Sequence, residues 1–570
     1  MGFVDRRGRG GVVALDRSMS FVASRLAFRY PAQTHKALDG IDLTLANGDV
    51  TWLTGALGSG TSTLLLTLSG LAPRLTGGDL SGAIAWNGHD PARRSPLLDG
   101  VAWLGPSPGQ QLSGVARNVH EEIAVGPMNL GWPRARILSA VAEAMRRVGI
   151  EHLAEREPSA LSGGETQRVL IAALLAAAPL AWLLDEPFSA LDRDARQRLG
   201  ALLRELAREG ACVVVSCDDA EDMMDVADRL VVLQQGTVAL DGDPQELLAS
   251  DAMLTTGAST TDAAALAAAA GFPTPRPITA AALISRLPAA RLPIPGAQVA
   301  RPEKSGPQRL RLDDVHFGYD GGPPVLGGVT LALAGGAAVG LFGANGAGKS
   351  TLLRLAMALE QPTAGTVHTL DQITAGRGPE DLAPRVGFLF QQPERQLFAA
   401  SVRGECSVAP TLAGWDSARI RTATDAVLAE LGLLDVAEEH PYDLPLPRRR
   451  LVALASILVT DPMLLLLDEP TAALDGASRE RVIAAVRERT ARGAAVLAIT
   501  HDATFAHETL DRALLLERGR IVHDGAVRDV LDDRSARRPA ALTAALHLGL
   551  EPGSDRRQEV VDVLTLALRL

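Results

Sequence analysis

The chain repeats one ordered set of short motifs, and the two copies lie about 285 residues apart, a period that indicates a duplicated domain rather than a solenoid. Thr61 pairs with Lys349 in this repeat, and Asp185 pairs with Asp468. Within each copy, short apolar segments alternate with helix-like segments, a pattern typical of a mainly parallel sheet flanked by helices. The sequence therefore predicts an α/β fold with two similar domains.

Composition shifts divide the chain into five predicted parts. These are a tail at residues 1–20, a first domain at 21–255, an Ala/Pro-rich linker and appendage at 256–306, a second domain at 307–535 and an appendage at 536–570. The linker composition predicts a loosely structured connector with one helix at 261–270. Inside the domains we expect helices at 63–71 and 351–359, and buried strands at 180–185, 211–216, 464–468 and 494–500.

The second copy contains a complete phosphate-binding loop, and the first copy contains a damaged one. Glycines at fixed spacing let backbone N–H groups turn onto phosphate oxygens, lysine reaches the β- and γ-phosphates, and a serine hydroxyl binds Mg²⁺. The complete loop supplies Gly343, Asn345, Gly346, Gly348, Lys349, Ser350 and Thr351. The damaged loop supplies Gly55, Gly58, Gly60, Thr61, Ser62 and Thr63. Because Thr61 replaces the lysine, we expect weaker nucleotide binding there.

Bulk properties exclude several other functions. The net charge of −11 does not suggest a nucleic-acid partner. Three cysteines form no CxxC pair, which predicts neither a disulfide framework nor a zinc site. No signal peptide is visible, and the apolar stretches at 169–184 and 323–348 contain Pro179 or many glycines, so we expect no membrane span. Arginine is the usual basic residue in this chain, so its composition alone does not explain Thr61.

An acid pair ends one predicted buried strand in each domain. A carboxylate at the end of a buried strand is costly unless it meets a cation, so Asp468 is a predicted Mg²⁺ ligand. Glu469 is next to it and is a candidate general base for an attacking water. Asp185 and Glu186 repeat this pair in the first domain.

Further motifs resemble those of ATP-binding-cassette (ABC) ATPases, and the resemblance covers almost all of both domains. The signature of that family is similar to a run of the first domain that includes Ser162, Gly163, Gly164 and Glu165. The resemblance implies a D-loop at Asp192, a switch histidine at His501 and a glutamine at Gln391 that contacts Mg²⁺ or water. It also implies that Tyr30 and Tyr319 stack on adenine, and that each domain has an antiparallel β subdomain and a helical signature subdomain.

Each domain departs from the family pattern in its own way. The first domain has Thr61 for the lysine and Cys217 for the switch histidine. Alignment of 101–112 with 386–397 places Pro106 where the second domain has the glutamine Gln391. The second domain keeps those residues, but Pro445 and Pro447 interrupt its signature. Proline has no N–H to donate, so this segment cannot imitate the donor-rich signature.

The resemblance implies that cassettes pair head to tail, so that each ATP meets one P-loop and the opposite signature. If the two domains of this chain pair in this way, the P-loop of the second domain and the signature of the first form one complete site. The P-loop of the first domain and the signature of the second form a site that contains all the substitutions described above. The resemblance assigns catalysis at the complete site to Lys349, Gln391, Glu469 and His501, with Ser350, Gln391 and Asp468 as Mg²⁺ ligands. ATP and Mg²⁺ are the expected cofactors, and ATP hydrolysis is the expected activity.

The stretch Gln391–Phe398 resembles one in the ATPases of energy-coupling-factor (ECF) importers. That resemblance implies a prokaryotic protein at the cytoplasmic face of the cell membrane, with a transmembrane coupling protein and a substrate-binding membrane subunit as partners. Two alternatives remain open. One is a ribosome-acting ABC-F-like ATPase, against which the linker and lost signature argue, and the other is the tandem ATPase of a sugar importer.

Overall fold

The computed structural model describes residues 20–527 except 32, 94, 97, 107, 190, 192, 288–305, 320–321, 345 and 473, and it also describes residue 560. The predicted N-terminal tail and C-terminal appendage thus lie almost entirely outside the described residues. The chain divides into two compact units, Met1–Thr260 and Thr261–Leu570. We refer to them as unit 1 and unit 2.

Unit 1 contains two sheets. A three-stranded antiparallel sheet has the order β2–β1–β4, and a six-stranded sheet has the order β5–β6–β7–β3–β8–β9. The larger sheet is parallel except for its edge strand β9. The strands are β1 Ser20–Arg29, β2 Leu38–Ala46, β3 Val50–Gly55, β4 Asp79–Trp86, β5 Val101–Leu104, β6 Ala181–Asp185, β7 Cys212–Ser216, β8 Arg229–Gln234 and β9 Thr237–Gly242.

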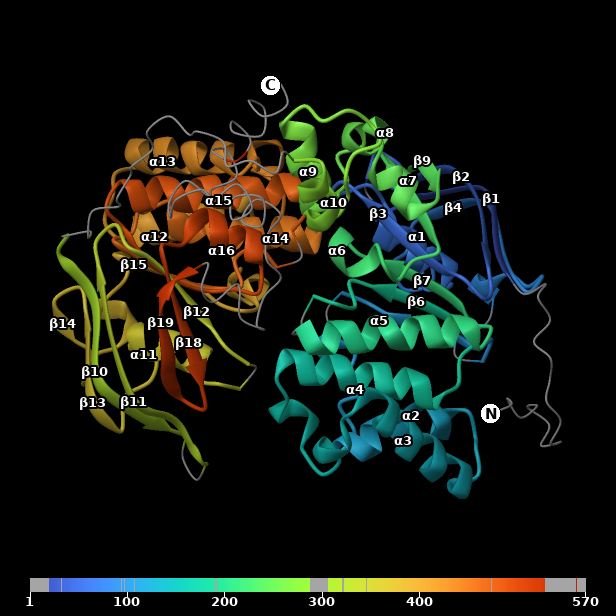
Figure 1. Ribbon diagram of the computed structural model, residues 1–570, viewed down its shortest axis with the longest axis horizontal. Coiled ribbons are helices and arrows are strands. Elements are labelled where there is room, and N and C mark those ends of the chain that lie inside the picture. The colour runs from blue at the N-terminus through green and yellow to red at the C-terminus, as the bar shows by residue number, and fades with distance from the viewer. Residues whose placement is uncertain are drawn as a thin grey trace. The chain divides into compact units, whose positions relative to one another are not determined.

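Three helices of unit 1, α2, α3 and α4, gather into an arm at one end of the unit (Figure 1). Their apolar faces enclose a small core of their own around Ile123, Val141 and Val169. The helices of the unit are α1 Thr61–Leu68, α2 Val119–Asn129, α3 Arg134–Val148, α4 Gly163–Ala176, α5 Arg193–Arg208, α6 Ala220–Met223, α7 Pro244–Leu248 and α8 Asp251–Thr255.

Unit 2 repeats this plan. Its sheets have the orders β11–β10–β13–β14 and β15–β16–β17–β12–β18–β19. Its strands are β10 Gln308–Gly318, β11 Pro324–Ala334, β12 Ala338–Phe342, β13 Ala364–Thr369, β14 Gln372–Ile373, β15 Val386–Leu389, β16 Leu464–Asp468, β17 Ala495–Ile499, β18 Arg512–Glu517 and β19 Arg520–Ala526. Its helices are α9 Asp262–Ala269, α10 Ala280–Ser285, α11 Lys349–Ala356, α12 Val402–Leu412, α13 Ser417–Glu430, α14 Leu446–Leu458, α15 Gly476–Ala491 and α16 Ala503–Thr509.

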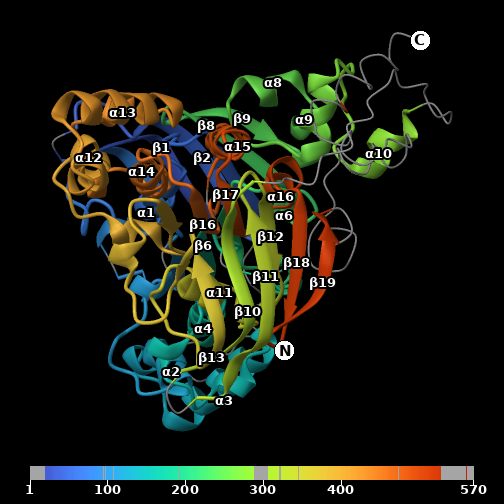
Figure 2. The same ribbon diagram turned by 90° about the vertical axis from the view of Figure 1, so that its left-hand side faces the viewer.

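Helix α11 packs between the two sheets of unit 2, and Figure 2 shows the antiparallel strands β10, β11 and β13 in front of β12 and β18. Every residue of β12, β16 and β17 is buried, as expected for parallel strands covered on both faces. The predicted α/β fold with an antiparallel subdomain and a helical subdomain in each half is confirmed. The predicted strands that end in acid pairs are confirmed as β6 and β16.

The linker differs in part from the sequence prediction. Residues 261–287 fold, because Thr261 caps α9 and Thr279 caps α10, and each hydroxyl accepts a hydrogen bond from the backbone three residues on. Leu266, Phe272 and Leu283 are buried there. The helix predicted at 261–270 is confirmed, whereas the expectation of a loosely structured connector is wrong for this segment.

The apolar stretches at 169–184 and 323–348 form short helices and strands. Across the described parts of the chain, no helix combines the length and the apolar character needed to cross a bilayer.

Candidate nucleotide site

The phosphate-binding loop of unit 2 joins β12 to α11. Three of its glycines have positive φ, at 142° for Gly343, 81° for Gly346 and 102° for Gly348. A Cβ at Gly343 would lie 2.2 Å from the carbonyl oxygen of Leu516, so both conformation and space require glycine there. Asn345 lies outside the described residues. The loop brings the N-terminus of α11, where free N–H groups favour anions, to the edge of the parallel sheet.

Lys349 is the first residue of α11, and its side chain is largely buried. Its ammonium group donates hydrogen bonds to the carbonyl oxygens of Gly343, at 2.7 Å, and Ala344, at 3.0 Å. The loop therefore holds the ammonium group over its own opening. A phosphate entering the loop would find a cation already in place.

The next residue of α11 contacts the predicted metal ligand. Ser350 Oγ donates to Asp468 Oδ2 at 2.8 Å. Burial raises the pKa of Asp468 to about 6, while the hydrogen bond from Ser350 and the charges of Lys349 and Arg354 oppose that rise. A divalent cation would relieve this desolvated carboxylate, so the hydroxyl and carboxylate oxygens suit Mg²⁺, which completes its shell with phosphate and water.

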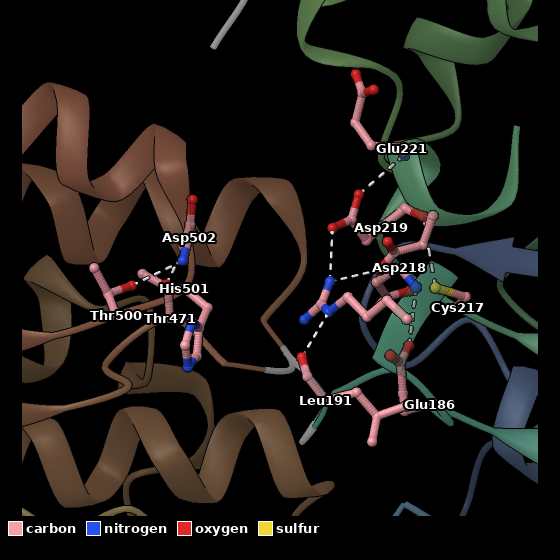
Figure 3. Close-up of polar contacts among 12 residues, drawn as sticks. Glu186, Leu191, Cys217, Asp218, Asp219, Glu221, Thr471, Thr500, His501 and Asp502 are labelled. Carbon is pink, nitrogen blue, oxygen red and sulfur yellow. Dashed lines mark hydrogen bonds and ion pairs between the residues drawn. The ribbon is translucent and has the colours of Figure 1, made fainter. Parts of the chain in front are cut away.

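Glu469 follows β16 with a φ of 54°, a strained conformation for a side chain of this size. Its Oε2 accepts a hydrogen bond from the backbone N–H of His501 at 3.2 Å, and its Oε1 lies 3.6 Å from His501 Nε2. Asp502 supports this loop by accepting a hydrogen bond from Thr471 Oγ1 at 2.8 Å (Figure 3). The candidate base is therefore oriented by the segment that carries the predicted switch histidine.

A pocket of about 470 Å³ connects the predicted adenine and metal residues of unit 2. Its lining includes Tyr319, Ser350, Thr351, Arg354, Gln391 and Asp468. The hydroxyl groups of Tyr319 and Thr351 lie 3.3 Å apart, which ties the aromatic ring to α11. The structure thus brings together residues from four separate motifs of this half.

The backbone of the damaged loop in unit 1 matches that of unit 2 at its second and third glycines. Gly58 has a φ of 81° and Gly60 a φ of 103°, nearly the values of their counterparts Gly346 and Gly348. The hydroxyl groups of Tyr30 and Thr63 lie 3.2 Å apart, as in the corresponding pair of unit 2. The backbone part of the phosphate site therefore survives the loss of the lysine.

The acid pair of unit 1 is retained but lies in a less favourable environment. Burial raises the pKa of Asp185 to about 6, against hydrogen bonds from Ser62 and Ser216. The pKa of Glu186 is raised well above its usual range by burial first and then by the carboxylates of Asp218 and Asp185.

The two signature segments differ at the start of their helices. Ser162 caps α4 with a complete capping box, in which its hydroxyl accepts from Glu165 N and Glu165 Oε2 accepts from Ser162 N at 2.8 Å. Pro445 occupies the same place before α14 and makes no side-chain cap. Gly163 and Gly164 form the first turn of α4, whereas Asp192 lies outside the described residues.

The structure corrects one alignment made from sequence. Glu186 N donates to Ser216 O, and Glu469 N donates to Ile499 O, so these pairs correspond. Two residues further on, Asp218 N donates to Glu186 Oε1 at 2.9 Å, as the backbone of the switch histidine does in unit 2 (Figure 3).

Asp218 is therefore the counterpart of His501, and the prediction that Cys217 stands there is wrong. Cys217 is a buried thiol that corresponds to Thr500. The neighbouring caps agree, because Asp219 caps α6 as Asp502 caps α16. The register between neighbouring strands decides this alignment, and the weakly similar loop sequences do not.

Sequence reasoning also missed the role of a glutamine. Gln396 Oε1 accepts from Phe390 N at 3.4 Å, and Gln396 Nε2 donates to Phe388 O at 3.2 Å. This side chain thus fixes the backbone just before Gln391. Gln111 repeats one contact in unit 1, where its Oε1 accepts from Gly105 N at 3.0 Å. The Gln-Leu run common to both halves was the available signal.

A family model described as ABC transporter matches residues 38–189 and 326–472. The chain belongs to the ABC transporter family. A Methanosarcina acetivorans protein provisionally named an ABC transporter ATP-binding protein is 30% identical over 95% of this chain and 90% of its own length. A Streptomyces coelicolor protein with the same provisional description is 33% identical, over 88% of this chain and 93% of its own length.

Among solved structures, cbiO1 from Clostridium perfringens, described as part of the ABC transporter complex cbiONQ, is 25% identical. It covers 43% of this chain and 96% of its own, with a TM-score of 0.38.

Membership of the ABC family identifies the protein as an ATPase that uses ATP with Mg²⁺. Within the described residues, no group of three or more His, Cys, Asp or Glu side chains could hold a metal ion by itself.

Proposed function

We propose that this ABC protein hydrolyses ATP at one composite site, formed by the P-loop of unit 2 and the signature of unit 1 in a head-to-tail pair within the chain. One observation carries the proposal: each unit keeps the half of the machinery that the other has lost. Unit 2 keeps Lys349 and His501, whereas unit 1 keeps the capped signature helix that begins after Ser162. Independent decay of two sites would not be expected to sort the lesions in this way.

The residues of unit 2 divide the chemistry among them. Lys349 supplies a positive charge at the β- and γ-phosphates. Ser350, Gln391 and Asp468 would hold Mg²⁺, which would supply positive charge to offset the negative charge of the phosphates. Glu469 polarises the attacking water and takes its proton, and the backbone N–H of His501 holds that carboxylate in position.

Matched variants of the two glutamates test this assignment. In Glu469→Gln, ATP turnover is expected to fall by about 10²–10⁴, because the general base is lost while the side chain keeps its shape. In Glu186→Gln, turnover is expected to stay within about twofold of the parent, since its site lacks the lysine. Steady-state phosphate release measures both. Turnover that survives Glu469→Gln but disappears in Glu186→Gln would refute the assignment.

We further propose that hydrolysis powers import through an ECF-type complex, in which the chain binds the cytoplasmic face of the membrane. A transmembrane coupling protein and a substrate-binding subunit are the partners. The position of Phe398 supports this, because the side chain is 73% exposed directly after the Gln391-containing loop. Glu405 accepts hydrogen bonds from the N–H groups of Phe398 and Ala399, which fixes the backbone there.

Unit 1 has a small polar residue in the corresponding place. Ser113 N donates to Glu122, just as Phe398 N donates to Glu405. An exposed aromatic ring in one unit and a serine in the other suggest that unit 2 carries the stronger apolar contact with a membrane partner.

Purification of the chain from its own host tests the partner class. The chain is expected to retain an integral membrane protein after detergent extraction, and Phe398→Ser, which copies Ser113, is expected to weaken that association. ATP hydrolysis by the isolated Phe398→Ser chain serves as the folding control. Co-sedimentation with ribosomes and no membrane partner would favour the ABC-F-like alternative instead.

A further inference from the structure

The two P-loop sites differ in the charge of the side chains around the nucleotide position. Three corresponding pairs of positions differ, and in each pair unit 1 has the less positive residue. The pairs are Lys349 and Thr61, Arg354 and Leu66, and His501 and Asp218. Formal charge at these positions therefore falls from +2 with neutral histidine to −1.

The loss of cations shows in the environment of the two buried acids. Lys349 and Arg354 both oppose the raised pKa of Asp468. The rise at Asp185 is opposed by the hydroxyl groups of Ser62 and Ser216. Both acids thus accept a hydrogen bond from a serine of their own P-loop, and the two cations near Asp468 are replaced by Thr61 and Leu66 in unit 1.

Asp218 adds a negative charge beside the surviving catalytic acid. Its backbone N–H donates to Glu186 Oε1, and its carboxylate raises the pKa of Glu186 by like-charge repulsion (Figure 3). Arg196 pairs with Asp222 at 2.5 Å and with Asp219 at 3.4 Å, so the nearby guanidinium group is occupied by other carboxylates. The segment that presents an imidazole in unit 2 presents an acid here.

Much of the part that holds the inner phosphates is nevertheless retained. The backbone angles of Gly58 and Gly60 match those of unit 2, and Ser62 still hydrogen-bonds Asp185. Backbone N–H groups of this loop type bind the α- and β-phosphates, whereas the lysine reaches both the β- and the γ-phosphate. The loss of the lysine therefore weakens contacts with both outer phosphates, and Asp218 adds a negative charge on the segment that carries the switch histidine in unit 2.

The altered signature segment of unit 2 carries three arginines. Its three arginines are all engaged inside unit 2. Arg448 pairs with Asp435 at 2.7 Å, Arg449 donates to the carbonyl oxygens of Leu444 and Tyr442, and Arg450 donates to that of Ala472.

We propose that the P-loop of unit 1 is a nucleoside diphosphate site that rejects the γ-phosphate. The inference rests on the proposed function, because it takes unit 1 as the non-hydrolysing half. The backbone loop and Ser62 bind the diphosphate and its Mg²⁺, and Asp218 repels the additional charge of a triphosphate. A bound diphosphate then keeps this half assembled while ATP turns over at the other.

Site-resolved photo-crosslinking tests this proposal on the full chain. The Glu469→Gln variant is labelled with 8-azido-ADP in the presence of Mg²⁺, and peptides containing Tyr30 and Tyr319 are quantified separately. At the Tyr30 peptide, ADP is expected to compete at least about tenfold better than ATP, equivalent to about 1.4 kcal/mol. At the Tyr319 peptide, no such preference for ADP is expected.

Substitutions at the switch segment identify the cause. Asp218→His and Asp218→Asn are expected to improve ATP competition at the Tyr30 peptide by at least about tenfold while leaving ADP competition unchanged. Cys217→Thr, which copies Thr500, is the matched control and should change neither. Labelling of the Tyr319 peptide verifies that each variant is folded.

Three outcomes would overturn the inference: no nucleotide at the Tyr30 peptide, equal or stronger competition by ATP there, or no effect of either Asp218 variant. Each leaves the glutamate test of the composite site unaffected, so failure of this inference and failure of the proposed function are distinguishable.

Discussion

The contact between Gln396 and the backbone before Gln391 predicts an effect on Mg²⁺ dependence. A Gln396 side chain that only stabilised the fold would have no such effect. Gln396 accepts a hydrogen bond from Phe390 N and donates one to Phe388 O. In Gln396→Ala both bonds are lost, and the first residues of the loop gain freedom. The predicted Mg²⁺ contact of Gln391 should weaken as a result.

The size of the effect follows from these two bonds. A neutral intramolecular hydrogen bond contributes about 1 kcal/mol, and the bond of 3.4 Å is a long one, so about 1–2 kcal/mol of positioning energy is at stake. This corresponds to a loss of about 5- to 30-fold in kcat/KM for ATP.

The assay is phosphate release as a function of Mg²⁺ concentration. Gln396→Ala is expected to raise the Mg²⁺ concentration needed for half-maximal activity, while the melting temperature changes little. Gln111→Ala removes the corresponding contact in unit 1 and is the matched control, which should leave both values unchanged. Equal losses in the two variants, or a loss of activity with unaltered Mg²⁺ dependence, would refute the reasoning.

Two further predictions concern the buried acids and the signature helix. Burial raises the folded-state pKa of Asp468 to about 6. Above that pH the ionised carboxylate lowers the free energy of unfolding of the nucleotide-free protein, and below about pH 4 this destabilisation is absent because the group is protonated in both states. At pH 8, Asp468→Asn should therefore raise the free energy of unfolding by up to ~3 kcal/mol, and with it the melting temperature. This gain should disappear as the pH falls towards 4, and the variant should not hydrolyse ATP. Asp185→Asn should give a similar gain in stability while ATP hydrolysis is retained. Calorimetry between pH 4 and pH 8 measures both gains, and a loss of stability at pH 8 in either variant would contradict the prediction. Ser162→Ala removes the N-cap of α4, which should lower the free energy of unfolding by about 1 kcal/mol and reduce ATP turnover. Ser159→Ala, on the preceding turn, is the control and should leave turnover unchanged. Equal turnover in the two variants would contradict a role for the signature.

Local chemistry explains why much of the site could be predicted from sequence. Gly343 and Gly60 mark positions where a side chain would meet a neighbouring carbonyl oxygen, so the loops are recognisable without any tertiary information. Leu464–Asp468 is recognisable as a buried strand with an acid at its end, because a short run of four leucines followed by an aspartate is typical of such a strand. The loss of the signature at Pro445 is equally local, since proline has no N–H in any fold.

Contacts between distant segments decided the rest. The pairing of Asp185 with Ser216 and of Asp468 with Ile499 fixes which residue faces each catalytic acid, and it assigns that place to Asp218.

The sequence by itself therefore determined the duplicated fold, both P-loops and the broken second signature, because each depends on the backbone needs of a few adjacent residues. Only the tertiary structure decided that an aspartate replaces the switch histidine, that Gln396 holds the loop before Gln391, and that the linker segment 261–287 is folded. Strand register and side-chain contacts across a loop depend on residues brought together by packing, and a linear spacing does not contain that information.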